Sequence, residues 1–153
     1  MLLFIFMTIL AIVASVLLHL GSAQVLISMW ARNASLRRWR VAVIIIAFII
    51  VHMLEIAIFA VSISVLINDG GYGSLNGVDT TDVGSLIYYS AITYTTVGYG
   101  DITPVGDIRL FAAIEALSGM VLVAWTASVI FTVMQRIWRE EQTEQAKVQG
   151  AGG

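Results

Sequence analysis

The residues best suited to chemistry lie in the run TTVGYGD, which occupies Thr95–Asp101. Glycine adopts left-handed backbone angles that other residues resist, so glycines alternating with Val97 and Tyr99 predict a backbone of alternating hand. Such a backbone points successive carbonyl oxygens to one side. Four copies around an axis would stack rings of oxygens that can replace the water shell of a cation. A single copy cannot surround an ion, so the run predicts an oligomer.

Two ionisable side chains, His52 and Glu55, lie three residues apart within apolar sequence and therefore on one face of a helix. Two interpretations are open: a sensor of protons or metal ions, and a structural hydrogen-bonded pair inside the membrane. Two ligands are too few for a convincing metal site, which favours the hydrogen-bonded pair. His19 stands alone in its segment, and we assign it no role.

The composition excludes an ordinary water-soluble domain. Hydrophobic residues make up 59% of the 153 residues and charged residues only 12%, against about 25% charged in a typical soluble domain. The absence of cysteine excludes disulfides and thiolate sites. A net charge of −2 gives no reason to expect nucleic acid as a partner. No hydrolase or redox motif is present, so we expect no enzyme and no organic cofactor.

Three apolar segments are each long enough to cross a bilayer, which takes about 20 residues per helix. We expect an all-α integral membrane fold of three transmembrane helices plus a re-entrant helix and loop. The predicted parts are an N-terminal helix at 1–29, a basic interfacial connection at 30–40, an outer helix at 41–67, a loop at 68–82, a re-entrant helix at 83–95, the TVGYGD turn at 96–101, an inner helix at 108–136 and a short tail at 137–153.

An alternative for the first segment is a signal peptide cleaved near Gly21–Ala23. The lack of positive charge in Met1–Thr8 and the apolar sequence that continues to Trp30 favour its retention.

Basic residues predict the orientation. Arginines crowd the 30–40 connection and follow the third segment, whereas the loop between the second and third segments has none before Arg109. Basic loops stay in the cytoplasm, so the connection and the C-terminus are expected inside, with the N-terminus and TTVGYGD outside. The short length suggests a prokaryotic inner membrane.

The segment before TTVGYGD is apolar but too short to span as a helix. Asp82 is placed to cap its first free amides. We therefore expect a re-entrant helix that enters the membrane and stops at Thr95. Non-helical backbone is tolerated at that depth only if it is buried in protein or lines a watery path.

The run Thr96–Gly100 resembles the selectivity filter of potassium channels, and the wider stretch from Tyr88 to Asp101 resembles their pore helix and filter. The resemblance extends from about Val41 to Arg136 and implies a homotetramer in the lipid bilayer with a central pore. It implies ion-binding residues, with K⁺ held by carbonyls of the first four and the outer end closed by the fifth: Thr96, Val97, Gly98, Tyr99 and Gly100.

The resemblance also implies supporting residues around the filter. Asp101 would sit behind the filter mouth, and we expect it to bond Tyr89. Relatives often carry a carboxylate at the position of Ile92, so filter stability could differ here. Glu115 either supports the filter from behind or accepts a hydrogen bond from a pore-helix hydroxyl, because an intramembrane carboxylate needs a polar partner.

Gly119 lies where family members carry a hinge glycine, and close helix packing explains it equally well. Candidate cavity-lining residues are Thr95, Met120, Val123, Ala127, Ser128 and Phe131. The sequence thus predicts a potassium-selective channel that conducts K⁺ passively. A weakly selective cation channel and an accessory subunit that needs a partner channel are the alternatives.

Overall fold

The computed structural model describes residues 1–30, 37–68 and 71–150 of the chain. Three of its helices are long and apolar enough to cross a membrane: α1 (Leu2–Trp30), α2 (Arg37–Asn68) and α4 (Ile108–Gly150). Large aliphatic side chains remain exposed along all three, which suits contact with lipid. The expected all-α membrane fold is confirmed.

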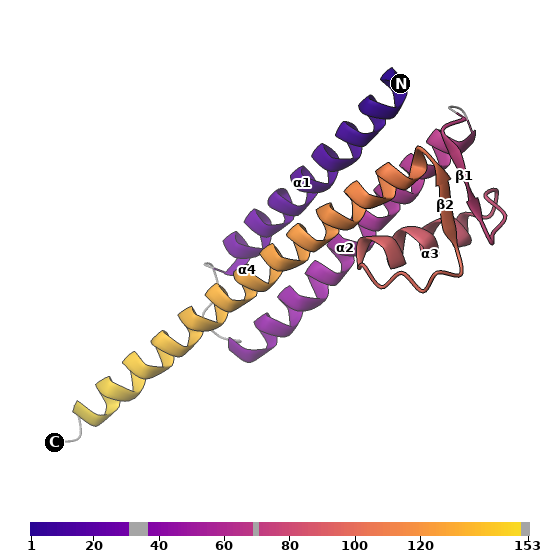
Figure 1. Cartoon of the computed structure of the whole chain (residues 1–153). Helices are drawn as coiled ribbons and strands as arrows, with labels where there is room; N and C mark the ends of the chain where they lie inside the picture. The colour runs from indigo at the N-terminus through magenta and orange to yellow at the C-terminus, as the bar shows by residue number, and fades with distance from the viewer. Residues whose placement is uncertain (31–36, 69–70, 151–153) are drawn as a thin grey trace.

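The N-terminus lies at the same end of the molecule as the segment between α2 and α4, and the C-terminus lies at the opposite end (Figure 1). The N-terminal ammonium group of Met1 donates a hydrogen bond of 2.8 Å to the Tyr72 hydroxyl in that segment. An odd number of spanning helices produces this arrangement.

The third spanning helix is longer than expected. The sequence predicted an inner helix that ends at residue 136 and a separate tail, but α4 continues to Gly150. The added stretch is rich in Glu, Gln, Arg and Lys, which are good helix formers, and it contains no proline. The expected interfacial connection lies mostly in residues 31–36, outside the described residues.

The re-entrant helix is α3 (Val83–Tyr94), and it packs between α2 and α4. Asp82 caps it as expected: its carboxylate accepts hydrogen bonds from the amides of Gly84 at 3.3 Å and Ser85 at 2.9 Å. Twelve residues at about 1.5 Å each reach only about half-way across a bilayer core of about 30 Å.

A two-stranded antiparallel ribbon brackets the re-entrant segment, and the sequence analysis did not anticipate it. Strand β1 (Gly73–Asn76) pairs with β2 (Thr103–Gly106), with Gly73 opposite Gly106. A Cβ atom on Gly73 would lie 2.0 Å from the carbonyl oxygen of Val105, so only glycine permits this approach. The ribbon ties the start of the loop to its end.

The core divides into two apolar clusters with polar side chains between them. The first cluster lies at the loop end and includes Phe59, Tyr94 and Phe111. The second joins Ala23, Ile44, Phe48 and Val133. On each spanning helix, the residues that lie between the part in the first cluster and the part in the second include buried polar side chains.

Asp82 provides a test of the cap. Hydrogen bonds from the hydroxyl and amide of Ser85 and the amide of Gly84 lower the pKa of Asp82 below its ordinary 3.8. The cap therefore stabilises the folded state at neutral pH, and this contribution is lost as the pH falls through the lowered pKa. Asp82→Asn can still accept these bonds but does not titrate, so thermal unfolding in detergent should show a smaller loss of stability for the variant between pH 6 and pH 3. Equal losses in both proteins would contradict this.

Candidate functional site

The backbone alternates in hand along the TTVGYGD run. The φ angles of Thr96, Gly98 and Gly100 are 58°, 51° and 83°, whereas those of Val97 and Tyr99 are not positive. A β-branched residue such as Thr96 rarely adopts a positive φ and is strained there by about 1–2 kcal/mol. The surrounding structure therefore holds this segment in a conformation that it would not adopt alone.

Two backbone hydrogen bonds anchor residues 96–98 to the end of α3. The amide of Thr96 donates to the carbonyl of Thr93 at 2.9 Å, and the amide of Gly98 donates to that of Ile92 at 3.1 Å. Within the described part of the chain, no hydrogen bond reaches the carbonyl oxygens of residues 96–99. These oxygens are free to accept another partner.

The run is exposed in a single chain. The side chain of Val97 is 52% exposed and that of Tyr99 is 73% exposed. Apolar and aromatic groups at membrane depth need protein or lipid around them, and non-helical backbone needs protein or a water-lined path. One chain therefore supplies only one side of this site.

The prediction that Asp101 bonds Tyr89 is wrong. The hydroxyl of Tyr88 donates to Asp101 Oδ2 at 2.9 Å, while Tyr89 is 3% exposed and packs in the first apolar cluster. Neighbouring helix residues point about 100° apart, so only one of the two tyrosines can face the end of the TTVGYGD run, which is called the filter run below. Ile92, with Tyr89, lines a groove behind the run; their support of the filter stays a prediction.

Glu115 is fully buried in α4 and contacts the hydroxyl of Ser90 in the re-entrant helix, which is the kind of partner that one of the two expectations named. Ser90 Oγ also lies 2.9 Å from the carbonyl oxygen of Ile56. One hydroxyl proton cannot serve both acceptors. Glu115 Oε2 has no hydrogen-bond partner among the described residues, and a bare charge there would be costly. A protonated Glu115 that donates to Ser90 satisfies both contacts.

Gly119 lies against the last turn of α3. A Cβ atom there would be 2.1 Å from the carbonyl oxygen of Tyr94 and 2.9 Å from its ring. Of the two interpretations of this glycine, close helix packing is therefore present in the structure. The hinge role stays a prediction.

The six residues predicted to line a cavity are all exposed in the single chain. They are Thr95, Met120, Val123, Ala127, Ser128 and Phe131. The side of α4 that packs on its own chain carries other residues, Leu122, Thr126 and Val133 among them. Lining of a pore stays a prediction for the six.

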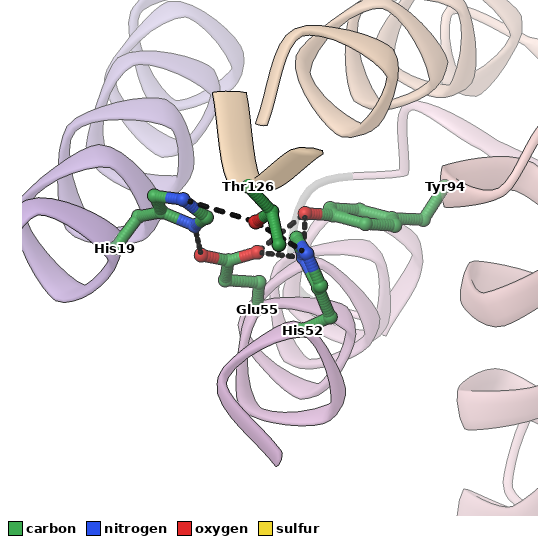
Figure 2. A network of polar contacts seen from close by, with 5 residues as sticks. All are labelled: His19, His52, Glu55, Tyr94 and Thr126. Atoms are coloured by element: carbon green, nitrogen blue, oxygen red, sulfur yellow. Dashed lines mark hydrogen bonds and ion pairs between the residues drawn. The ribbon is translucent and has the colours of Figure 1, made fainter. Parts of the chain in front are cut away.

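A buried polar network lies between the two apolar clusters, and Figure 2 shows its five members. Glu55 is fully buried and stands at its centre. His19 Nδ1 lies 2.9 Å from Glu55 Oε1, and His52 Nδ1 lies 2.9 Å from Glu55 Oε2. The hydroxyl of Tyr94 donates to Glu55 Oε2. Both Nε2 atoms face Thr126 Oγ1, at 3.0 Å from His52 and 3.4 Å from His19.

The expected pairing of His52 with Glu55 is therefore present, but it is one part of a larger arrangement. Sequence reasoning gave no role to His19, which the structure brings to the same carboxylate from α1. The available signal was weak: a fully buried histidine in an apolar helix needs a polar partner, but its identity depends on helix packing.

Comparison with known proteins bears on the filter run and the helices around it. A family model described as "Ion channel" matches residues 39–136, nearly two thirds of the chain. The chain belongs to this family, of the potassium-channel pore-domain type. The description of the family is that of a channel, and the matched range is close to the stretch 41–136 in which the pore domain was expected.

Two curated relatives of this family member illustrate the likeness. The potassium voltage-gated channel protein Shal of Drosophila melanogaster is 30% identical over 70 residues, which are 45% of this chain and 12% of Shal. The voltage-gated potassium channel regulatory subunit KCNG1 of Homo sapiens is 32% identical over 94 residues, 61% of this chain and 18% of that protein. The chain thus spans less than a fifth of their length. No solved structure gives a significant match.

Gly119→Ala tests the packing against α3. The added methyl group would meet backbone, which cannot move aside as a flexible side chain can, so we expect a loss of about 1–3 kcal/mol in the free energy of unfolding. Gly21→Ala in α1 is the matched control, because a Cβ there meets nothing within 4 Å. Unfolding in detergent should separate the two. Equal stability of both variants would contradict the packing role.

Glu115 provides a second test. Glu115→Gln keeps a donor for Ser90 and should change the free energy of unfolding by less than about 1 kcal/mol. Glu115→Ala removes the donor and opens a cavity, so a loss of about 2–4 kcal/mol is expected. If the glutamine variant unfolded as easily as the alanine variant, the channel-family fold would need the negative charge, and the protonated form would be excluded.

Proposed function

We propose that four copies of this chain form a potassium-selective channel that conducts K⁺ passively across a membrane. The observation that carries the proposal is the filter run itself: an alternating backbone with carbonyl oxygens at residues 96–99 that accept no hydrogen bond within the described chain. Family membership and the printed names of the relatives support potassium as the ion.

In the proposed mechanism, a hydrated K⁺ ion loses its water to rings of carbonyl oxygens from Thr96, Val97, Gly98 and Tyr99 of each copy. The Thr96 hydroxyl completes the innermost site, and Gly100 ends the row. Ions move by repulsion between adjacent sites. The C-terminal end of α3, at Tyr94, carries the negative end of the helix dipole and favours a cation beneath the filter.

The proposed assembly is a homotetramer in the bilayer. Its support is the exposure of Val97 and Tyr99, which other copies would cover. The filter end and the N-terminus lie at one end of the molecule and the C-terminus at the other. From the placement of the arginines we assign the filter end to the outside and the C-terminus to the cytoplasm.

A second candidate function is that of an accessory subunit. KCNG1, which matches 61% of this chain, is by its name a regulatory subunit. In that case the purified chain would pass no ions by itself and would conduct only with a partner channel. A weakly selective channel is the third outcome, which the apolar Ile92 behind the filter motivates.

The test is the reversal potential of the purified chain in planar bilayers under a K⁺/Na⁺ gradient. We expect reversal near the K⁺ equilibrium potential. Reversal near zero with robust current would instead establish a weakly selective channel. Silence from a chain that chemical cross-linking shows to be tetrameric, over the pH range in which it stays folded, would overturn the proposal in favour of the accessory role.

Filter variants connect the current to these residues. Gly98→Ala places a side chain at a φ of 51°, and Thr96→Ala removes the hydroxyl of the innermost site, so each should abolish K⁺ selectivity or conduction. Gly21→Ala, far from the run, is the control and should conduct as the wild type does. K⁺ currents of normal selectivity in both filter variants would exclude this conduction path.

A further inference from the structure

The chain contains two histidines, and both meet at one buried carboxylate. His19 comes from α1 and His52 and Glu55 from α2, and one ligand atom from each lies within 4.8 Å of the others. His19 and Glu55 are fully buried, and the side chain of His52 is 17% exposed. Conduction through the filter makes no use of these groups.

The protons of this network do not balance when both imidazoles are neutral. If each Nδ1 atom carries a proton to bond ionised Glu55, both Nε2 atoms are left as bare acceptors. His52 Nδ1 also lies 3.0 Å from the Tyr94 hydroxyl, whose proton goes to Glu55 in that arrangement. Both Nε2 atoms face Thr126 Oγ1, and its hydroxyl has one proton to give. One ring nitrogen therefore stays unpaired inside the protein, which is costly. The site lacks one positive charge.

Positive charge can reach this site in two ways, as a proton on one imidazole or as a divalent metal ion bound to the three side chains. If both Nδ1 atoms and Glu55 bind the ion, each Nε2 carries a proton and donates to Thr126 Oγ1, whose two lone pairs can accept both. Tyr94 donates to Glu55 Oε2 from outside the ligand set. Figure 2 shows Thr126 facing both imidazoles. Histidine ligands of metal ions commonly have their second nitrogen fixed by such an outer partner.

We propose that His19, His52 and Glu55 form a binding site for a divalent transition-metal ion of the zinc class. Two imidazoles and a carboxylate suit Zn²⁺ or Co²⁺ and are a poor match for Ca²⁺ or Mg²⁺, which prefer oxygen ligands. In a tetrahedral site with ligand distances of about 2.0–2.2 Å, ligand atoms lie about 3.3–3.6 Å apart. The three side chains, whose ligand atoms now lie within 4.8 Å of one another, would therefore have to draw together by up to about 1 Å. Three protein ligands leave one position for water.

The bound ion would join α1 to the pore domain. His19 belongs to α1, which lies outside the matched range of residues 39–136. The outer partners belong to the other elements: Thr126 to α4 and Tyr94 to the end of α3, next to the filter run. Metal occupancy would therefore fix the position of α1 against the base of the filter, whatever ion the channel conducts.

The test uses the untagged full chain in detergent, freed of metal with EDTA. Titration with Zn²⁺ should reach one ion per chain and raise the thermal unfolding temperature, and EDTA should reverse the rise. Co²⁺ in place of Zn²⁺ should give visible absorption bands of a four- or five-coordinate nitrogen–oxygen site. No stoichiometric binding, with stability that depends on pH and not on metal, would overturn the proposal and assign the missing charge to a proton.

Variants locate the ion. His19→Gln and Glu55→Gln should abolish stoichiometric binding, and Thr126→Val should weaken it about 10–100-fold as an outer partner. Glu115→Gln changes the other buried carboxylate and is the matched control, with unchanged affinity expected. Unchanged binding in His19→Gln would overturn the site. If that variant failed to fold, the wild-type stoichiometry and the cobalt spectrum would decide, and neither depends on ion conduction.

Discussion

The contact between the carbonyl oxygen of Tyr94 and the bare backbone of Gly119 is the constraint on which the rest of this structure depends. It places the end of α3 directly against α4, at a distance that no side chain on Gly119 would permit. From this fixed end the chain leaves the helix, and Thr96 enters its strained conformation. On the other side, the Tyr94 ring lies between His52 and Phe59 and brings its hydroxyl to Glu55.

Two glutamates are buried between the spanning helices, and the structure satisfies them in different ways. Glu115 contacts a single hydroxyl, an environment that suits an uncharged carboxyl group. Glu55 faces two imidazoles and a phenol, an environment that suits a carboxylate. Because an unpaired charge in a low-dielectric interior is expensive, the partners decide the protonation state of each group. Both glutamates contact residues of α3, so the position of the filter depends on both.

The filter run is complete as a local structure and incomplete as a binding site. Its backbone hand follows from glycine at 98 and 100 and from the two hydrogen bonds that hold it to α3. Within the described chain, its carbonyl oxygens at residues 96–99 accept no hydrogen bond, and the side chains of Val97 and Tyr99 remain exposed. In a ring of copies, these oxygens would face a common axis and these side chains would be covered by neighbouring copies. We therefore propose that the assembly, and not the single chain, conducts ions.

The sequence by itself determined the spanning helices, the re-entrant helix with its Asp82 cap, the alternating backbone and the family, because these depend on apolar length, local capping and glycine spacing. Tertiary structure alone decided the rest. The β1–β2 pairing joins residues about thirty positions apart, and the choice of Tyr88 over Tyr89 for Asp101 depends on how α3 is rotated. His19 joined Glu55 only through the packing of α1 on α2, and no local pattern in an apolar helix specifies which buried groups meet across it.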